Sequence, residues 1–162
     1  MSATGLEVFD KTLQTTNTWL GELMETLDVD RHTAWKVLGV VLRKLRDRVP
    51  VELSAHLGAQ LPLLVRGVYY DQFEPSKQPT RCDAIEQFAA EVGVHLADIR
   101  PIDPELAVRA VFALLSRHIP EGQIGKIQEA LPGHIRDAWA TAAEGTEAPG
   151  RKDLGAGPRA RA

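Results

Sequence analysis

The strongest constraint on this chain is an internal repeat. Residues 34–70 align without a gap on residues 104–140, and six of the thirty-seven pairs are identical. Other pairs change residue type and stay apolar, such as Leu42 with Phe112 and Tyr69 with Trp139. A duplicated apolar pattern predicts two similar packing units. The identical pairs are Val41 with Val111, Leu45 with Leu115, Pro50 with Pro120, Leu61 with Leu131, Pro62 with Pro132 and Arg66 with Arg136.

Apolar residues recur at helical spacing along most of the chain, which predicts amphipathic helices. Asp30 and Asp103 are predicted N-caps, and Thr80 to Asp83 resembles a capping box that would start a helix near residue 81. No run of alternating β-branched residues predicts a sheet. We therefore expect an all-α helical bundle of about seven to eight helices, over residues 6–27, 31–48, 51–58, 62–70, 81–92, 104–118, 120–130 and 132–143.

The repeat also predicts the domain organisation. We expect a single all-α domain over residues 1–143, with a first repeat at 6–70, a linker at 71–80 and a second, pseudo-symmetric repeat at 81–143. Residues 144–162 are rich in Gly, Ala, Pro and charge and lose the helical period. Such a composition buries too little apolar area to offset chain entropy, so a disordered tail is predicted there.

Charge and composition narrow the classes of function. A net charge of -3 and a pI near 5.9 argue against a protein built mainly to grip nucleic acid. Cys82 is the single cysteine, so a disulfide within the chain or a cysteine-based metal cluster is excluded. The first residues show no signal-peptide pattern, and no apolar run is long enough to span a bilayer. We expect a cytoplasmic protein without membrane contact.

Three segments resemble a known bacterial family. They read TLQTTNTWLGELMETL, LRKLRDRVP and HLGAQLPLLVRGVYYDQF, and the similarity to domain-of-unknown-function family 2267 extends over about residues 6–140. The resemblance implies a small cytoplasmic helical protein of two related halves, with no established activity, cofactor or catalytic residue to transfer. Phe73 stands where many relatives have a tryptophan.

Catalytic and metal-binding motifs are missing from the sequence. The five histidines form no HxxxH or HxH pair, and no carboxylate pair lies beside them at ligand spacing. There is no GxSxG, P-loop or GxGxxG motif. We therefore predict no catalytic residue, no metal and no cofactor, and an enzyme is the less favoured class.

One group of residues suggests a binding site. Arginine beside aromatic rings can clamp a carboxylate or phosphate while the rings supply apolar contact area. The alternative is that each arginine pairs with a helix and each aromatic ring fills its own half of the core, because both recur in the two copies. Both interpretations stay open for Arg66, Tyr69, Tyr70, Phe73, Arg136 and Trp139.

The function predicted from these patterns is a non-catalytic protein-interaction or regulatory module, with a protein partner of unstated identity and an open oligomeric state. One alternative is a binder of a small anionic ligand, or an enzyme, with a pocket near Arg66 and Arg136. A second alternative is a weak nucleic-acid binder. The basic group at residues 43–48 is interpreted as a solvated helix end, since Asp47 lies within it and Glu52 follows.

Overall fold

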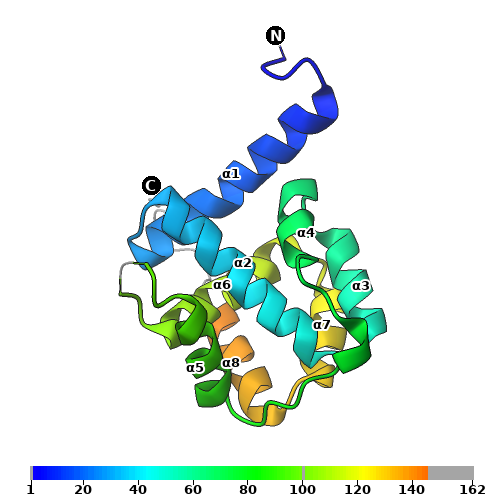
Figure 1. The fold of residues 1–162 in the computed structure, drawn as a ribbon, viewed down its shortest axis with the longest axis vertical. Helices are drawn as coiled ribbons and strands as arrows, with labels where there is room; N and C mark the ends of the chain where they lie inside the picture. The colour runs from blue at the N-terminus through cyan, green and yellow to red at the C-terminus, as the bar shows by residue number, and fades with distance from the viewer. Residues whose placement is uncertain (1, 100, 146–162) are drawn as a thin grey trace, which may run out of the picture.

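The protein is described here from a computed structural model that covers residues 2–99 and 101–145. These residues contain eight α-helices, one 3-10 helix and no strand, which confirms the all-α prediction (Figure 1). The elements are α1 (Glu7–Leu27), α2 (Arg31–Arg48), α3 (Val51–Gln60), α4 (Leu63–Tyr69), η1 (Pro75–Lys77), α5 (Ile85–His95), α6 (Pro104–His118), α7 (Glu121–Ala130) and α8 (Gly133–Glu144). Of the tail predicted from 144 onward, residues 146–162 lie outside the described residues.

The predicted caps of α2 and α6 are confirmed. The Asp30 carboxylate accepts a hydrogen bond from Thr33 N at 2.8 Å, and that of Asp103 accepts one from Glu105 N at 2.9 Å. The capping box predicted for α5 is wrong, because this helix begins at Ile85 and its N-cap makes no side-chain hydrogen bond. Instead, Thr80 N donates to the carbonyl of Asp47 at 2.7 Å.

The linker between the copies forms hydrogen bonds with the C-terminal end of α2. For this reason α5 begins at Ile85 and not at the predicted residue 81. The side-chain amide of Gln78 donates to Val49 O at 2.9 Å and to Ser54 Oγ at 2.6 Å. Residues 78–84 are therefore not helical, and Cys82 is buried. Tertiary contacts override the local capping pattern here.

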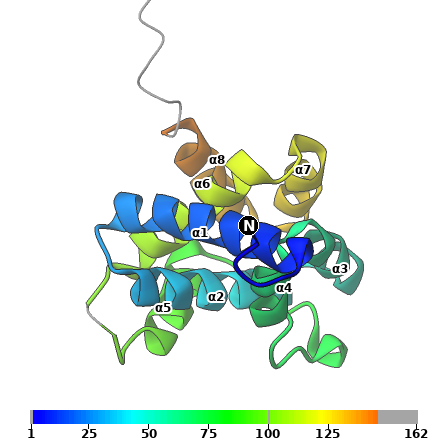
Figure 2. The ribbon, with the colours of Figure 1, turned by 90° about the horizontal axis from the view of Figure 1, so that it is seen from above.

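The two copies have matching elements. The bounds of α3 and α7 differ by seventy positions at both ends, as do the first residues of α4 and α8 and the last residues of α2 and α6. The packed pairs also correspond: α1 packs on α6 and α5 on α2, while α2 packs on α6 and α3 on α7. Figure 1 and Figure 2 show α3 and α7 at the same end of the molecule. The pseudo-symmetry of the two repeats stays a prediction.

The core is continuous across both copies and centres on α6, which packs against α1, α2, α5, α7 and α8. Phe112 of α6 stacks on Trp139 of α8 with ring centroids 4.3 Å apart and lies 5.9 Å from the ring of Phe88. Buried aromatic rings contribute large apolar areas, so this cluster is expected to dominate stability. Within the described residues, no helix is both long and apolar enough to cross a membrane.

The interpretation of residues 43–48 as a solvated helix end is wrong for two of the arginines. Arg46 and Arg48 are buried, with 3% and 6% of their surface exposed. Arg46 Nη1 donates to the carbonyls of Tyr69 and Asp71 at 2.7 and 2.8 Å. Arg48 forms an ion pair with Glu91 of α5. The last turn of α2 is thus covered by the chain that follows α4 and by α5, which the local charge pattern does not reveal.

The N-terminal half of α1 has no helical counterpart in the second copy. Subtracting seventy from the start of α5 gives position 15, whereas α1 starts at Glu7. Figure 1 shows this additional part of α1, in dark blue, rising away from the rest of the molecule. Its side chains are therefore not explained by the packing that the two copies share.

Candidate functional site

Arg66 and Arg136 each donate hydrogen bonds to backbone carbonyls at the C-terminal end of the preceding helix. Arg66 Nε donates to Gly58 O at 2.8 Å, and its Nη2 donates to Ala59 O at 3.2 Å and Leu61 O at 3.1 Å. Arg136 repeats this pattern seventy positions later. Its Nε donates to residue 128 at 2.9 Å, and its Nη2 donates to residues 129 and 131, both at 3.1 Å. Cations favour the carbonyl end of a helix, so packing alone accounts for an arginine in both copies.

Tyr69 and Trp139 are fully buried, with 0% of their surface exposed. The Tyr69 hydroxyl donates to the carbonyl of Ser54 at 2.7 Å, and Trp139 Nε1 donates to the hydroxyl of Ser116 at 2.8 Å. Burial raises the pKa of the Tyr69 hydroxyl far above its ordinary value. The polar atoms of both rings thus have hydrogen-bond partners inside the protein.

Tyr70 and Phe73 are half-buried next to Tyr69. The Tyr70 ring lies edge-on to Tyr69 at 4.9 Å and to Phe73 at 5.6 Å, and the Arg46 guanidinium sits 5.0 Å over the Phe73 ring. The structure thus joins three of the predicted site residues in one aromatic row. Arg66 lies on α4 and its side chain contacts the end of α3, whereas residues 136 and 139 belong to α8.

A groove lies between α1 and α4, and Arg66 is part of its wall. We call it the α1–α4 groove; it has a volume of about 370 Å³. Leu64 N approaches Thr12 Oγ1 of α1 at 3.4 Å, which is a weak contact between its two sides. The lining residues are Val8, Lys11, Thr12, Thr15, Trp19, Gln60, Leu61, Pro62, Leu63, Arg66 and His118.

Large apolar side chains are exposed on the two helices beside this groove, and Val8 and Leu63 among them line it. On α1, Phe9 and Leu13 continue the helix face that buries Leu20 and Leu23 further along, yet 47% and 41% of their surfaces are exposed. The helical spacing of this face was visible in the sequence, but its exposure was not, because the spacing does not say where the body of the protein ends. We define the N-terminal apolar surface as Leu6, Val8, Phe9, Leu13, Leu63 and Leu64, all exposed.

The basic residues that line the α1–α4 groove are Lys11, Arg66 and His118. His118 stacks on Trp19 at 5.0 Å, and its Nε2 lies 2.8 Å from the Glu22 carboxylate, which also accepts from Arg117 Nη2 at 3.0 Å. Arg66 uses Nε and Nη2 on helix carbonyls. The groove therefore presents basic side chains next to an apolar rim.

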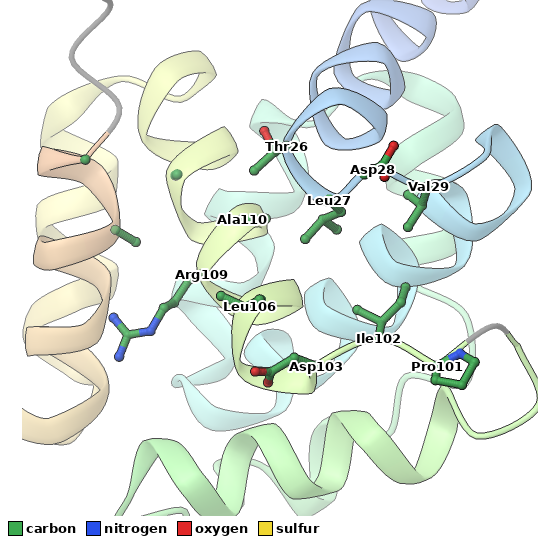
Figure 3. A pocket seen from close by; sticks show the side chains of 13 residues that line it. Thr26, Leu27, Asp28, Val29, Pro101, Ile102, Asp103, Leu106, Arg109 and Ala110 are labelled. Atoms are coloured by element: carbon green, nitrogen blue, oxygen red, sulfur yellow. The ribbon is translucent and has the colours of Figure 1, made fainter.

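A second hollow, of about 410 Å³, lies where α1 ends near α6 and α8. Figure 3 shows Leu27 and Ile102 beside it and Arg109 extending toward α8. Arg109 pairs with Glu105 at 2.8 Å, and Asp103 caps α6, so both charged groups already serve helices. Because Arg109 and Asp103 already have partners within the protein, this hollow presents mainly apolar surface. It is therefore the weaker candidate for a binding site.

No group of three or more metal-ligating side chains occurs within residues 2–99 and 101–145. Cys82 is a buried thiol whose Sγ lies 3.5 Å from the carbonyl of Ala84. The described residues thus offer an apolar surface and basic side chains, which suit binding.

Comparison with known proteins adds the family. The sequence model described as "Uncharacterized conserved protein (DUF2267)" matches residues 16–138. No curated protein matches the chain. The matched region begins just after the projecting part of α1.

Proposed function

The chain belongs to the DUF2267 family of uncharacterised proteins, and from the geometry of its surface we propose that it is a protein-interaction module. Its N-terminal apolar surface and the α1–α4 groove bind an amphipathic segment of a partner protein. The cytoplasm is the proposed compartment, which the single, buried and reduced cysteine supports.

The observation that carries this proposal is the exposed apolar face on the projecting half of α1. Leu6, just before α1, and Val8, Phe9 and Leu13 within it are 41% to 58% exposed. They precede the family match, and this part of the chain has no helical counterpart in the second copy. Single apolar side chains on a surface need no explanation, but a cluster on one outstretched helix marks an interaction site. Amphipathic helices are a common element at such sites.

Charge indicates the chemistry of the partner. Lys11 and Arg66 line the groove next to its apolar rim, and the groove lining contains no carboxylate. A segment with apolar residues on one side and aspartate or glutamate at its edge would match both features. Electrostatic complementarity of this kind mainly directs orientation and speeds association, while the apolar contacts hold the complex.

The test begins with a photoreactive phenylalanine analogue in place of Phe9, incorporated in cells of the native host. The crosslinked partner is then purified and its dissociation constant measured by calorimetry. We expect Phe9→Ser and Leu13→Ser to weaken binding by about tenfold or more, as truncation of interface anchors does. Val94→Ser is the matched control, since Val94 is 74% exposed on α5.

Three results would overturn the proposal. They are the absence of any crosslinked protein, an affinity that Phe9→Ser and Leu13→Ser leave unchanged, and an equal loss in the control. If the crosslinked product is a second copy of this chain and sedimentation velocity shows a dimer, the surface serves self-association instead.

A further inference from the structure

A cluster of basic side chains lines a small hollow beside α2. The hollow has a volume of about 140 Å³. Its titratable lining residues come from α2 and, through His95, from the end of α5. The two helices are joined by the ion pair of Arg48 with Glu91. We call it the cationic hollow, lined by Val40, Arg43, Lys44, Arg46, Asp47, Gln72 and His95.

The side chains that line the cationic hollow carry a net positive charge even when the Asp47 carboxylate is included. Arg43, Lys44 and Arg46 face a single acidic lining residue, Asp47, whose Oδ1 accepts a hydrogen bond from Arg46 Nε at 2.9 Å. Arg46 is committed to the carbonyls that follow α4. By contrast, no hydrogen bond from the side chain of Arg43 or Lys44 is present among the described residues, so their donors remain available.

The surroundings disfavour these charges. Burial lowers the pKa of Lys44, and the charge of Arg48 lowers it further. Burial lowers the pKa of Arg43 too, although the Asp71 carboxylate acts in the opposite direction. For His95, burial and then the charges of Lys44, Arg43 and Lys36 lower the pKa. A bound anion would reverse this balance, because an opposite charge at short range favours the protonated forms.

The cluster is not part of the duplicated framework. At the positions equivalent to Arg43, Lys44 and Arg46, the second copy has residues 113, 114 and 116, which are Ala, Leu and Ser. The first two of these are buried in the core. Packing common to the two copies therefore does not require cations here.

We propose that the cationic hollow binds a phosphate group of a small molecule or free phosphate, held by Arg43, Lys44 and His95. A guanidinium binds two phosphate oxygens in one plane, and a lysine ammonium adds a compact charge. The Gln72 side-chain amide, also in the lining, supplies a neutral donor. This site is independent of the N-terminal apolar surface.

The experiment measures the pKa of all five histidines by NMR in inorganic phosphate and in chloride at equal ionic strength. Glu91 and Asp98, four positions before and three positions after His95 in the sequence, pair with Arg48 and Lys36. We expect phosphate to raise the pKa of His95 by about 1 unit and to leave the other four unchanged.

Lys44→Gln and, as a second variant, Arg43→Gln should remove the shift in the pKa of His95. Lys126→Gln, at an exposed position of α7, should keep this shift. An unchanged His95, a similar shift at every histidine, or an undiminished response in both hollow variants would overturn the proposal. A short DNA duplex forms the second arm. If only the duplex shifts His95, the ligand is a nucleic-acid backbone, and the small-molecule proposal is wrong.

Discussion

At the scale of single residues, the predicted repeat is our criterion for separating framework from candidate site. Arg66 and Arg136 donate to carbonyls at corresponding positions of their own halves, and Tyr69 and Trp139 both point a polar tip into the core. The sequence raised framework and binding as alternatives for these residues. It could not decide between them because a repeated arginine beside an aromatic residue is expected in either case.

Replacing Arg66 by alanine removes three hydrogen bonds from the end of α3. We expect Arg66→Ala to lower the free energy of unfolding by about 1 to 2 kcal/mol, because hydrogen bonds from a charged donor each contribute modestly. Arg136→Ala should lose less, since Arg136 is more exposed. Urea denaturation measures both, with Lys126→Ala as a surface control. Equal stability of Arg66→Ala and the control would contradict this role.

Tyr69 makes stability sensitive to alkaline pH. Its folded-state pKa is raised above the ordinary 10.0, mainly by burial. Below pH 10 the hydroxyl is neutral in both states and its contribution is fully present. Above it the unfolded chain loses the proton first, so the stability contributed by the group falls as pH rises toward the folded pKa.

Tyr69→Phe should therefore cost about 1 kcal/mol at neutral pH, through the lost hydrogen bond to Ser54 O, and should show a shallower loss of stability above pH 10. Thermal unfolding between pH 8 and 11 in wild type and variant checks both expectations. Parallel curves over that range would contradict the buried, neutral state of the hydroxyl.

At the scale of elements, most helices could be predicted, because the apolar period and the Asp and Pro residues at their starts are local signals. The start of α5 could not, since Gln78 and Thr80 bind the end of α2. The burial of Arg46 escaped prediction for the same reason: its carbonyl partners lie more than twenty residues away in sequence.

Gly58 shows how the two copies differ within one element. A Cβ on Gly58 would lie 2.7 Å from Tyr70 Cζ, whereas the second copy has Gln128 and Ala140 at these positions. The second copy thus has a larger residue at the position of Gly58 and a smaller one at the position of Tyr70. The Tyr70 ring occupies the space that a side chain at position 58 would fill, so glycine is needed there.

Gly58→Ala should destabilise the protein by about 1 to 3 kcal/mol through overpacking. In a Tyr70→Ala background the same change should be neutral or stabilising by up to about 1 kcal/mol, because alanine favours the helix over glycine. A double-mutant cycle in urea measures the coupling. Additive effects of the two substitutions would contradict the close contact.

At the scale of the whole molecule, the shared core and the unshared surface have different explanations. The core runs through both copies, with α6 against α1, α2, α5, α7 and α8. The projecting half of α1 and the cationic hollow are features that the second copy lacks. We assign framework to what is duplicated and binding to these additions.

The most direct test of this assignment is the free energy of unfolding of the double variant Phe9→Ser and Leu13→Ser, measured by urea denaturation beside the core variant Leu23→Ser. Phe9 and Leu13 are exposed, whereas Leu23 is 0% exposed. We predict a change within about 0.5 kcal/mol for the double variant and a loss of several kcal/mol for Leu23→Ser. A loss of about 2 kcal/mol or more in the double variant would show that these side chains are framework and would contradict the account.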